Sequence, residues 1–282
     1  MCLLVVVSRL DPGAPLVVGA NRDERLDRGA LAMTVLHESN PRILGGRDEE
    51  AGGTWLAVNQ HGVVAGLTNR PSPGGRQADK RSRGELPLAL ARHRDAASAV
   101  EDFVARLRPS DYNPAWLLVG DRTSLYALDM TAARDIGDTG PGEDRPTVEQ
   151  LGPGIHILEN NPLGDHAPKA AHVRKLLGDA GARRGDELID RLRSVLVDHS
   201  VPEDTVPEDT VPTDSVPEES GSAGPARPVE TLAACVHSDS YGTRSSTIVR
   251  VPASAGVHPQ VLVADGHPCT SPFVDVSGLF EA

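Results

Sequence analysis

Cysteine is scarce in this chain of 282 residues, and the three cysteines present lie far apart. Cys2, Cys235 and Cys269 show no C-x-x-C spacing, and an odd number of thiols cannot all pair. This arrangement supports neither a disulfide framework nor a zinc ribbon. We therefore expect reduced thiols, no bound metal and a cytoplasmic location.

Long apolar runs and an excess of basic charge are also absent. No stretch approaches the ~20 apolar residues that a membrane helix needs. The first apolar run meets Asp11-Pro12-Gly13 too soon for a signal peptide, and no basic residue precedes it. Nucleic acids and anionic membranes bind a concentrated basic face, whereas the formal net charge here is −12. We expect no membrane span and no nucleic-acid partner, and the oligomeric state stays open.

Much of the acidic excess lies in one segment of unusual composition. Residues 201–220 read VPEDTVPEDTVPTDSVPEES, with seven acidic residues and no basic one. Proline interrupts helices and strand pairing, and the segment has too little apolar surface to bury. We expect 201–228 to be a disordered loop inserted into a single domain that spans 1–282.

The remaining sequence predicts antiparallel strands with helices grouped between them. Sheets built from such strands need cover on their faces, so we expect an α+β sandwich of sheets and helices. A Ser82-x-x-Glu85 capping box predicts the start of the first helix. Further helices are predicted over 96–107, 166–177 and 186–197, and strands over 2–8, 16–20, 54–58, 63–68, 116–119, 125–130, 155–158, 232–237, 246–251 and 260–264.

Cysteine at position 2 follows only the initiator methionine. Removal of that methionine would leave a thiol and an α-amine on one residue. The amine titrates near ~7.7–8.0 and a free thiol near ~8.5, so the amine is suited to accept the thiol proton. This placement predicts an N-terminal nucleophile. The alternative is a small residue buried in a strand, because cysteine is among the most buried residue types.

Five polar or glycine-rich islands lie at the predicted strand ends and turns. Each alone is typical of a solvated turn or a surface charge. Taken together with Cys2, they are the candidate residues for chemistry. The islands are Asn21-Arg22-Asp23-Glu24, Gly52-Gly53-Thr54-Trp55, Leu67-Thr68-Asn69-Arg70, Asn160-Asn161-Pro162 and Tyr241-Gly242-Thr243-Arg244.

These motifs, in this order behind Met1-Cys2, resemble the NRDE family, which includes the transport and Golgi organisation protein 2 group. The Arg83-Gly84-Glu85-Leu86 motif and the run from Tyr241 to Ile248 belong to the same resemblance. The resemblance implies a relation to N-terminal-nucleophile hydrolases and a four-layer αββα fold. One departure touches the site: Leu158-Glu159-Asn160-Asn161 stands where the family usually has Leu-Ser-Asn-Ala.

More distantly, the chain is similar to bile-salt and penicillin V acylases. The resemblance implies a nucleophile, Cys2, an aspartate that holds its amine, and an arginine that favours the thiolate. It also implies two asparagines that stabilise the oxyanion. Those acylases carry an arginine three residues before the aspartate, where this chain has Ala20. The implied catalytic set is Cys2, Asp23, Asn69, Asn160 and Arg244, and we assign Asn21, Arg22, Trp55 and Tyr241 to substrate binding.

The resulting prediction is a cofactor-free hydrolase that acts on an amide or related acyl bond of a small molecule. A second reading from the family is a haem carrier, for which ten histidines and Cys2 offer candidate axial ligands. No C-x-x-C-H attachment site supports it, and His267-Pro268-Cys269 is typical of a turn. A third reading is a structural or adaptor role with Cys2 filling a strand.

Overall fold

The computed structural model describes residues 2–72, 75–132, 144–164, 167–202 and 229–281. The predicted loop over 201–228 therefore lies outside the described residues, except for its first two positions. The prediction of one domain over the whole chain stays a prediction.

One sheet is built around the N-terminal strand. Its order is β10-β1-β2-β11-β12-β13, and every neighbouring pair is antiparallel. We call it sheet A. Alternate residues of its strand β1 enter different cores, so the apolar run at 2–7 is buried on both faces. The strands are β1 (Cys2–Asp11), β2 (Ala14–Arg25), β10 (Gly154–Leu158), β11 (Tyr241–Val251), β12 (Gln260–Asp265) and β13 (Val274–Asp275).

The second sheet, sheet B, runs in sequence order from β3 to β9 and is also antiparallel. Short turns join β3 to β4, β5 to β6 and β7 to β8, whereas residues 70–114 separate β6 from β7. The strands are β3 (Ala30–His37), β4 (Ile43–Asp48), β5 (Leu56–Asn59), β6 (Val64–Asn69), β7 (Ala115–Gly120), β8 (Leu125–Met130) and β9 (Thr147–Gln150).

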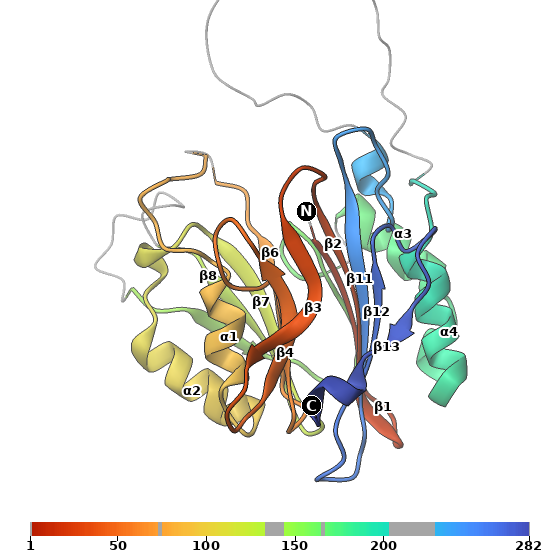
Figure 1. Ribbon diagram of the computed structural model, residues 1–282, viewed down its shortest axis with the longest axis horizontal. Coiled ribbons are helices and arrows are strands. Elements are labelled where there is room, and N and C mark those ends of the chain that lie inside the picture. The colour runs from red at the N-terminus through yellow and green to blue at the C-terminus, as the bar shows by residue number, and fades with distance from the viewer. Residues whose placement is uncertain (1, 73–74, 133–143, 165–166, 203–228, 282) are drawn as a thin grey trace, which may run out of the picture.

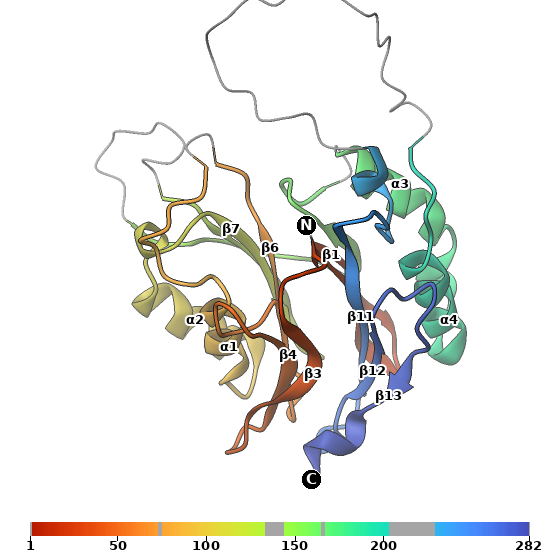
Figure 2. The same cartoon turned by 45° about the horizontal axis from the view of Figure 1, so that its top comes forward.

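Helices cover the outer face of each sheet, as Figure 2 shows. One core lies between the sheets, a second between sheet A and its helices, and a third between sheet B and its helices. This arrangement confirms the predicted α+β fold with αββα layers (Figure 1). Helices α1 (Glu85–Ala91) and α2 (Ala96–Arg106) pack on sheet B, and α3 (Pro168–Leu177) and α4 (Gly185–Leu196) pack on sheet A.

Two local predictions are wrong. The first helix starts at Glu85 with Gly84 as N-cap and no side-chain cap, because Ser82 Oγ accepts from Gly84 N instead. The run at 232–237 is not a strand: a 3-10 helix, η5 (Val229–Leu232), leads into a buried irregular segment. Shorter 3-10 turns are η1 (Pro109–Asp111), η3 (Ala180–Ala182) and η6 (Ser277–Phe280). Among the described helices, none is both long and apolar enough to cross a bilayer.

Candidate active site at the start of β1

Cys2 begins β1 and lines a cleft of about 510 Å³ between the two sheets. The other walls come from the end of β2, the segment before β5, the end of β6 and the residues that precede α1. The lining is strongly polar. Its charged members are seven basic residues, Arg22, Arg25, Arg28, Arg76, Lys80, Arg81 and Arg83, and three acidic ones, Asp23, Glu24 and Asp48.

The Cys2 side chain is half-buried and lies opposite Arg22 in the β1–β2 pairing. Burial raises the pKa of the thiol, and the charge of Asp23 raises it further, while Arg22 acts in the opposite direction. The surroundings therefore do not deliver a thiolate by themselves. A nucleophile at this position needs a base that takes its proton.

Asp23 is 2% exposed and sits in a dense polar network. Lys169 Nζ, from α3, lies 3.1 Å from one carboxylate oxygen, and Thr243 Oγ1 donates to the other at 2.6 Å. The Lys169 side chain is itself 1% exposed. Sequence analysis missed this lysine, although its place on the apolar face of α3, beside Ala170 and Val173, was a usable signal.

The two predicted asparagines are brought near each other by their neighbours. Thr68 Oγ1 donates to Glu159 O at 2.5 Å, which joins the end of β6 to the segment after β10. Asn69 is exposed and lines the cleft. Asn160 is buried, does not line the cleft, and its Oδ1 has no hydrogen-bond partner within the described residues.

Glu159, the departure from the family pattern, holds the backbone at this point. Its carboxylate accepts from Asn160 N at 3.0 Å and from the Asn161 amide. The glutamate is 4% exposed. The substitution therefore stabilises the turn that carries Asn160 and does not add a carboxylate to the cleft lining.

Arg22 and Trp55 line the cleft, as predicted for substrate binding. The Arg22 guanidinium lies 4.3 Å from the Trp55 ring centroid and pairs with Asp48 at 3.4 Å. Its Nη1 is buried and makes no hydrogen bond to any described residue. Burial lowers the pKa of Arg22. One face of this cation is thus fixed and one nitrogen is left for a ligand.

Arg244 is not where the acylase resemblance implies it. The pairing of β11 with β2 shifts between Thr243 and Ser245, so that Arg244 is the extra residue of a bulge. Its Nη1 donates to the backbone oxygens of Leu26, at 2.7 Å, and Arg28. Arg244 is absent from the cleft lining, and the charge opposite Cys2 is Arg22.

Asn21 and Tyr241, which we predicted for substrate binding, are not among the described residues that line the cleft. Because neighbours in a strand face opposite sides, Asn21 points away from the cleft that Arg22 lines. Its Nδ2 donates to Leu196 O and Ala234 O, at the end of α4 and before β11. The Tyr241 hydroxyl donates to Asp23 O at 2.9 Å and fixes the backbone there.

Arg83 is the most informative residue that sequence analysis did not select as a site. It lines the cleft, and its Nη1 donates to Pro114 O at 3.2 Å. Burial lowers its pKa, Arg76 adds to that effect, and the Cys2 sulfur acts against it. Arg83 thus lines the same cleft as Cys2. Its position in the Arg83-Gly84-Glu85-Leu86 motif was the available signal.

The cleft does not fit haem. Haem needs an apolar slot and an axial ligand, whereas Trp55 and Leu67 are the only large apolar side chains in the part of the cleft wall that the structure describes. Among the described lining residues, Cys2 is the only one of a type that ligates haem iron. The geometry therefore gives the carrier reading no support at this site.

Comparisons with known proteins agree with the motif order. A family model described as Transport and Golgi organisation 2 matches residues 1–259. The Transport and Golgi organization protein 2 homolog of Bos taurus is 32% identical over 258 residues, covering 86% of this chain and 84% of that protein. The homolog from Mus musculus is 29% identical over 257 residues with the same coverage.

Solved structures show a likeness in fold. An N-acylethanolamine-hydrolyzing acid amidase ortholog from Caenorhabditis elegans matches with a TM-score of 0.50 and 13% identity, over 90% of this chain and 94% of that one. A mutant conjugated bile acid hydrolase from Clostridium perfringens matches with a TM-score of 0.47 and 13% identity, over 98% and 92%. The family resemblance read from the sequence is confirmed, and the chain belongs to the Transport and Golgi organisation 2 family.

Proposed function

We propose that this protein is a hydrolase with an N-terminal cysteine nucleophile, which cleaves an amide or related acyl bond in a small anionic molecule. The observation that carries the proposal is the position of Cys2. It starts β1 at the wall of a cleft that Arg22, Asp23 and Asn69 also line. The fold likeness to an acid amidase supports the amide as the bond type.

The reaction begins after Met1 is removed. The α-amine of Cys2 takes the thiol proton, and the sulfur attacks the substrate carbonyl carbon to form a tetrahedral oxyanion. Collapse of this intermediate breaks the bond to the leaving group, which receives the proton from the amine. Water then hydrolyses the thioester and regenerates the thiol. The amine supplies the base that the raised pKa of the thiol requires.

The surrounding residues have separate roles in this proposal. Asp23, held by Lys169 and Thr243, orients the amine. The Asn69 amide is available to donate to the oxyanion, and loss of such a donor typically costs ~10²–10³ in rate. We place Asn160 behind Asn69, as a support for the same wall.

The charge of the lining supports an anionic substrate. Arg22 keeps a buried nitrogen without a hydrogen bond to any described residue, and Arg83 is held by a carbonyl oxygen. A buried donor left unpaired is costly, so a ligand that accepts from it gains affinity. A carboxylate meets this requirement because it accepts two hydrogen bonds from one guanidinium. The free thiols of all three cysteines agree with action in the cytoplasm.

The first testable prediction concerns Cys2 itself. Cys2→Ala should lower the turnover of N-acyl amides at least 10³-fold, since no nucleophile remains. The far-UV circular dichroism should stay unchanged. Product release is measured by mass spectrometry on substrate pairs that differ only in a carboxylate. The mass of the intact protein shows whether Met1 has been removed.

Two outcomes contradict the proposal. One is full turnover by Cys2→Ala, and the other is an active protein that retains Met1. A titration of the purified protein with haem, followed by the Soret band, tests the carrier reading in the same preparation. A saturable, shifted band that Cys2→Ala abolishes would favour haem binding over hydrolysis.

A further inference from the structure

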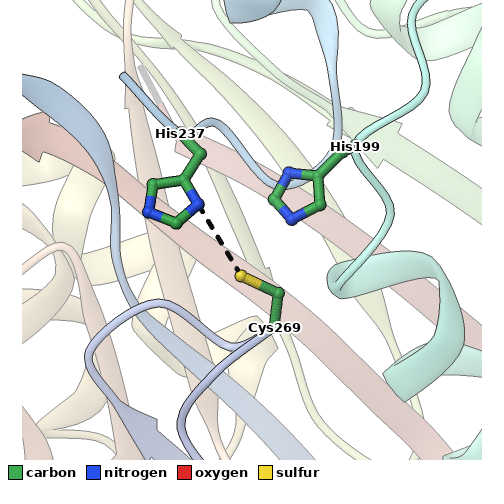
Figure 3. A group of neighbouring side chains, drawn as sticks. All are labelled: His199, His237 and Cys269. Carbon is green, nitrogen blue, oxygen red and sulfur yellow. Dashed lines mark hydrogen bonds between the residues drawn. The ribbon is translucent and has the colours of Figure 1, made fainter. Parts of the chain in front are cut away.

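A second group of reactive side chains lies on the far side of sheet A. His199 follows α4, His237 precedes β11, and Cys269 lies in the turn after β12. One ligand atom from each lies within 4.8 Å of the other two. Figure 3 shows the three side chains converging from separate segments of the chain. Close packing of two imidazoles and a thiol from distant segments needs a physical reason.

The distances suit a tetrahedral metal ion. His237 Nδ1 and Cys269 Sγ are 3.9 Å apart. In a zinc site with Zn–S of about 2.3 Å and Zn–N of about 2.0 Å, the nitrogen and the sulfur lie roughly 3.5 Å from each other. Both histidines are exposed, so small rotations of their side chains close the remaining gap.

One ring nitrogen of His199 already makes the hydrogen bond that a metal-bound histidine usually makes through its non-ligating nitrogen. His199 Nδ1 lies 2.9 Å from Cys235 O, and a carbonyl oxygen only accepts, so Nδ1 carries the proton. The other nitrogen, Nε2, is then left with a free lone pair. A hydrogen bond from the non-ligating nitrogen to a backbone carbonyl is a usual feature of metal-bound histidine.

Two further side chains of the same types lie next to these three. The His267 ring packs at 3.9 Å from the His237 ring. The Cys235 thiol hydrogen-bonds to Cys269. Two thiols and three imidazoles thus lie together.

We propose that His199, His237 and Cys269 bind Zn²⁺, with water in the fourth coordination position. Imidazole and thiolate together favour zinc among the common divalent ions. On binding, the Cys269 thiol loses its proton to solvent, and one S–Zn and two N–Zn bonds form. This site replaces our sequence-based expectation of no metal.

The location indicates a structural role. Cys235 N donates to Asp198 O. Val236 N donates to Thr243 Oγ1, and the Thr243 hydroxyl in turn donates to the Asp23 carboxylate. A metal bound here fastens the segment before β11 to α4 and to the turn after β12. It would therefore stiffen the support behind Asp23 without entering the cleft.

The test uses the full-length protein after removal of metal with a chelator. We expect one Zn²⁺ per chain in a competition titration against a chromophoric chelator, and a thiolate-to-metal charge-transfer band when Co²⁺ is bound. Cys269→Ser and His199→Ala should each lower the zinc affinity by about 10²-fold or more, and Cys269→Ser should abolish the band. Affinity should fall as the pH is lowered, because the ligands must lose protons.

Two controls make the outcome decisive. His172→Ala removes a half-buried histidine whose Nε2 contacts Ser200 and which is not one of the three proposed ligands, and it should leave zinc affinity unchanged. Cys2→Ser should do the same, which separates this site from the proposed hydrolase centre. The proposal is overturned if no stoichiometric Zn²⁺ binds, or if binding survives both Cys269→Ser and His199→Ala.

Discussion

At the scale of single residues, Arg22 brings Cys2, Trp55 and Asp48 together at the wall of the cleft. It pairs across the sheet with Cys2, stacks on Trp55 and contacts Asp48 through one side of its guanidinium. The same cation therefore acts on the thiol, and under our proposed function its Nη1 donates to the substrate. No described basic residue other than Arg22 stands opposite Cys2 in the strand register.

We predict that Arg22→Gln raises the pKa of the Cys2 thiol. Burial and Asp23 already raise this pKa, and the change removes a charge that lowers it. The pH at which Cys2 becomes half-maximally reactive toward iodoacetamide should move upward, as followed by mass spectrometry of the N-terminal peptide. Arg106→Gln, on an arginine that is 70% exposed, is the matched control. An unchanged profile would mean that Arg22 does not act on the sulfur.

We also predict a large loss of stability for Lys169→Met. The change leaves the Asp23 carboxylate in a buried site without its cation, and such a loss costs about 3–5 kcal/mol. Urea unfolding measures it. The double variant with Asp23→Asn should lose less than the sum of the two single changes, because the residues interact. Strict additivity would contradict the buried pair.

The sequence predicted which residues gather at the cleft better than it predicted where their side chains point. Cys2, Arg22, Asp23, Trp55 and Asn69 all line the cleft, as the motifs predict. The roles of Asn21 and Arg244 depended on side-chain direction, which a one-residue shift or bulge reverses. Neither the bulge at Arg244 nor the Lys169 partner of Asp23 is visible without knowing which strands pair.

At the scale of elements, β4 controls the position of Trp55. A Cβ on Gly46 would lie 1.9 Å from Trp55 Cζ2, so no side chain fits there without moving the indole. Glycine at this point lets the ring pack flat on the strand and carry Arg22. The wall of the cleft thus depends on a residue that does not line it.

We predict that Gly46→Ala displaces Trp55 and lowers stability by about 1–3 kcal/mol, in the range for overpacked sites. Tryptophan fluorescence should shift, and the affinity for a carboxylate substrate or inhibitor should fall with it. Gly278→Ala is the control, since a Cβ there meets no atom within 4 Å. Equal behaviour of the two variants would contradict the proposed packing.

Asp121, in the turn between β7 and β8, caps α2 from a distance. Its Oδ2 accepts from Ala96 N at 2.7 Å, and its Oδ1 accepts from Thr123 N at 2.7 Å. Burial alone would raise the pKa of Asp121, but these hydrogen bonds hold it below its usual value. The carboxylate therefore stabilises the fold above the unfolded pKa of ~3.9, and this contribution is lost as the pH falls through the lower folded value.

For Asp121→Asn we expect a loss of about 1–2 kcal/mol at neutral pH, typical of a removed helix cap. The difference from the unchanged protein should shrink as the pH falls below ~3.9, because both chains then carry a neutral group. Thermal unfolding across pH 2–8 measures it. A pH-independent difference would show that charge is not the cause.

The elements that the sequence predicted are those with a clear period. Helices α2 and α4 and the β5–β6 hairpin lie close to their predicted bounds, whereas β2 extends from Ala14 to Arg25 and so includes the Asn21–Glu24 island that was expected at a strand end. Strands β3 and β4 were missed because β3 is mostly half-buried and β4 contains Gly45 and Gly46, so neither shows clean alternation. The run at 232–237 was misread because burial alone does not make a strand.

At the scale of the whole molecule, the four layers bring both ends of the described chain to one sheet. Strand β1 at the N-terminus and β11 near the C-terminus flank β2, so the cysteine and its aspartate network come from opposite ends of the sequence. Because Thr243 of β11 donates to the Asp23 carboxylate, a displacement of β11 would also change the position of Asp23.

The basic cleft on a chain of net charge −12 also has a kinetic consequence. Acidic surroundings repel an approaching anion, while a local positive opening attracts it, so diffusion delivers it selectively to that opening. Under our proposed function, kcat/KM for a carboxylate substrate should fall between 20 and 500 mM NaCl, as screening shortens to a few ångströms. A neutral analogue should show no such decline. The dependence of the rate on ionic strength therefore distinguishes anionic from neutral candidate substrates.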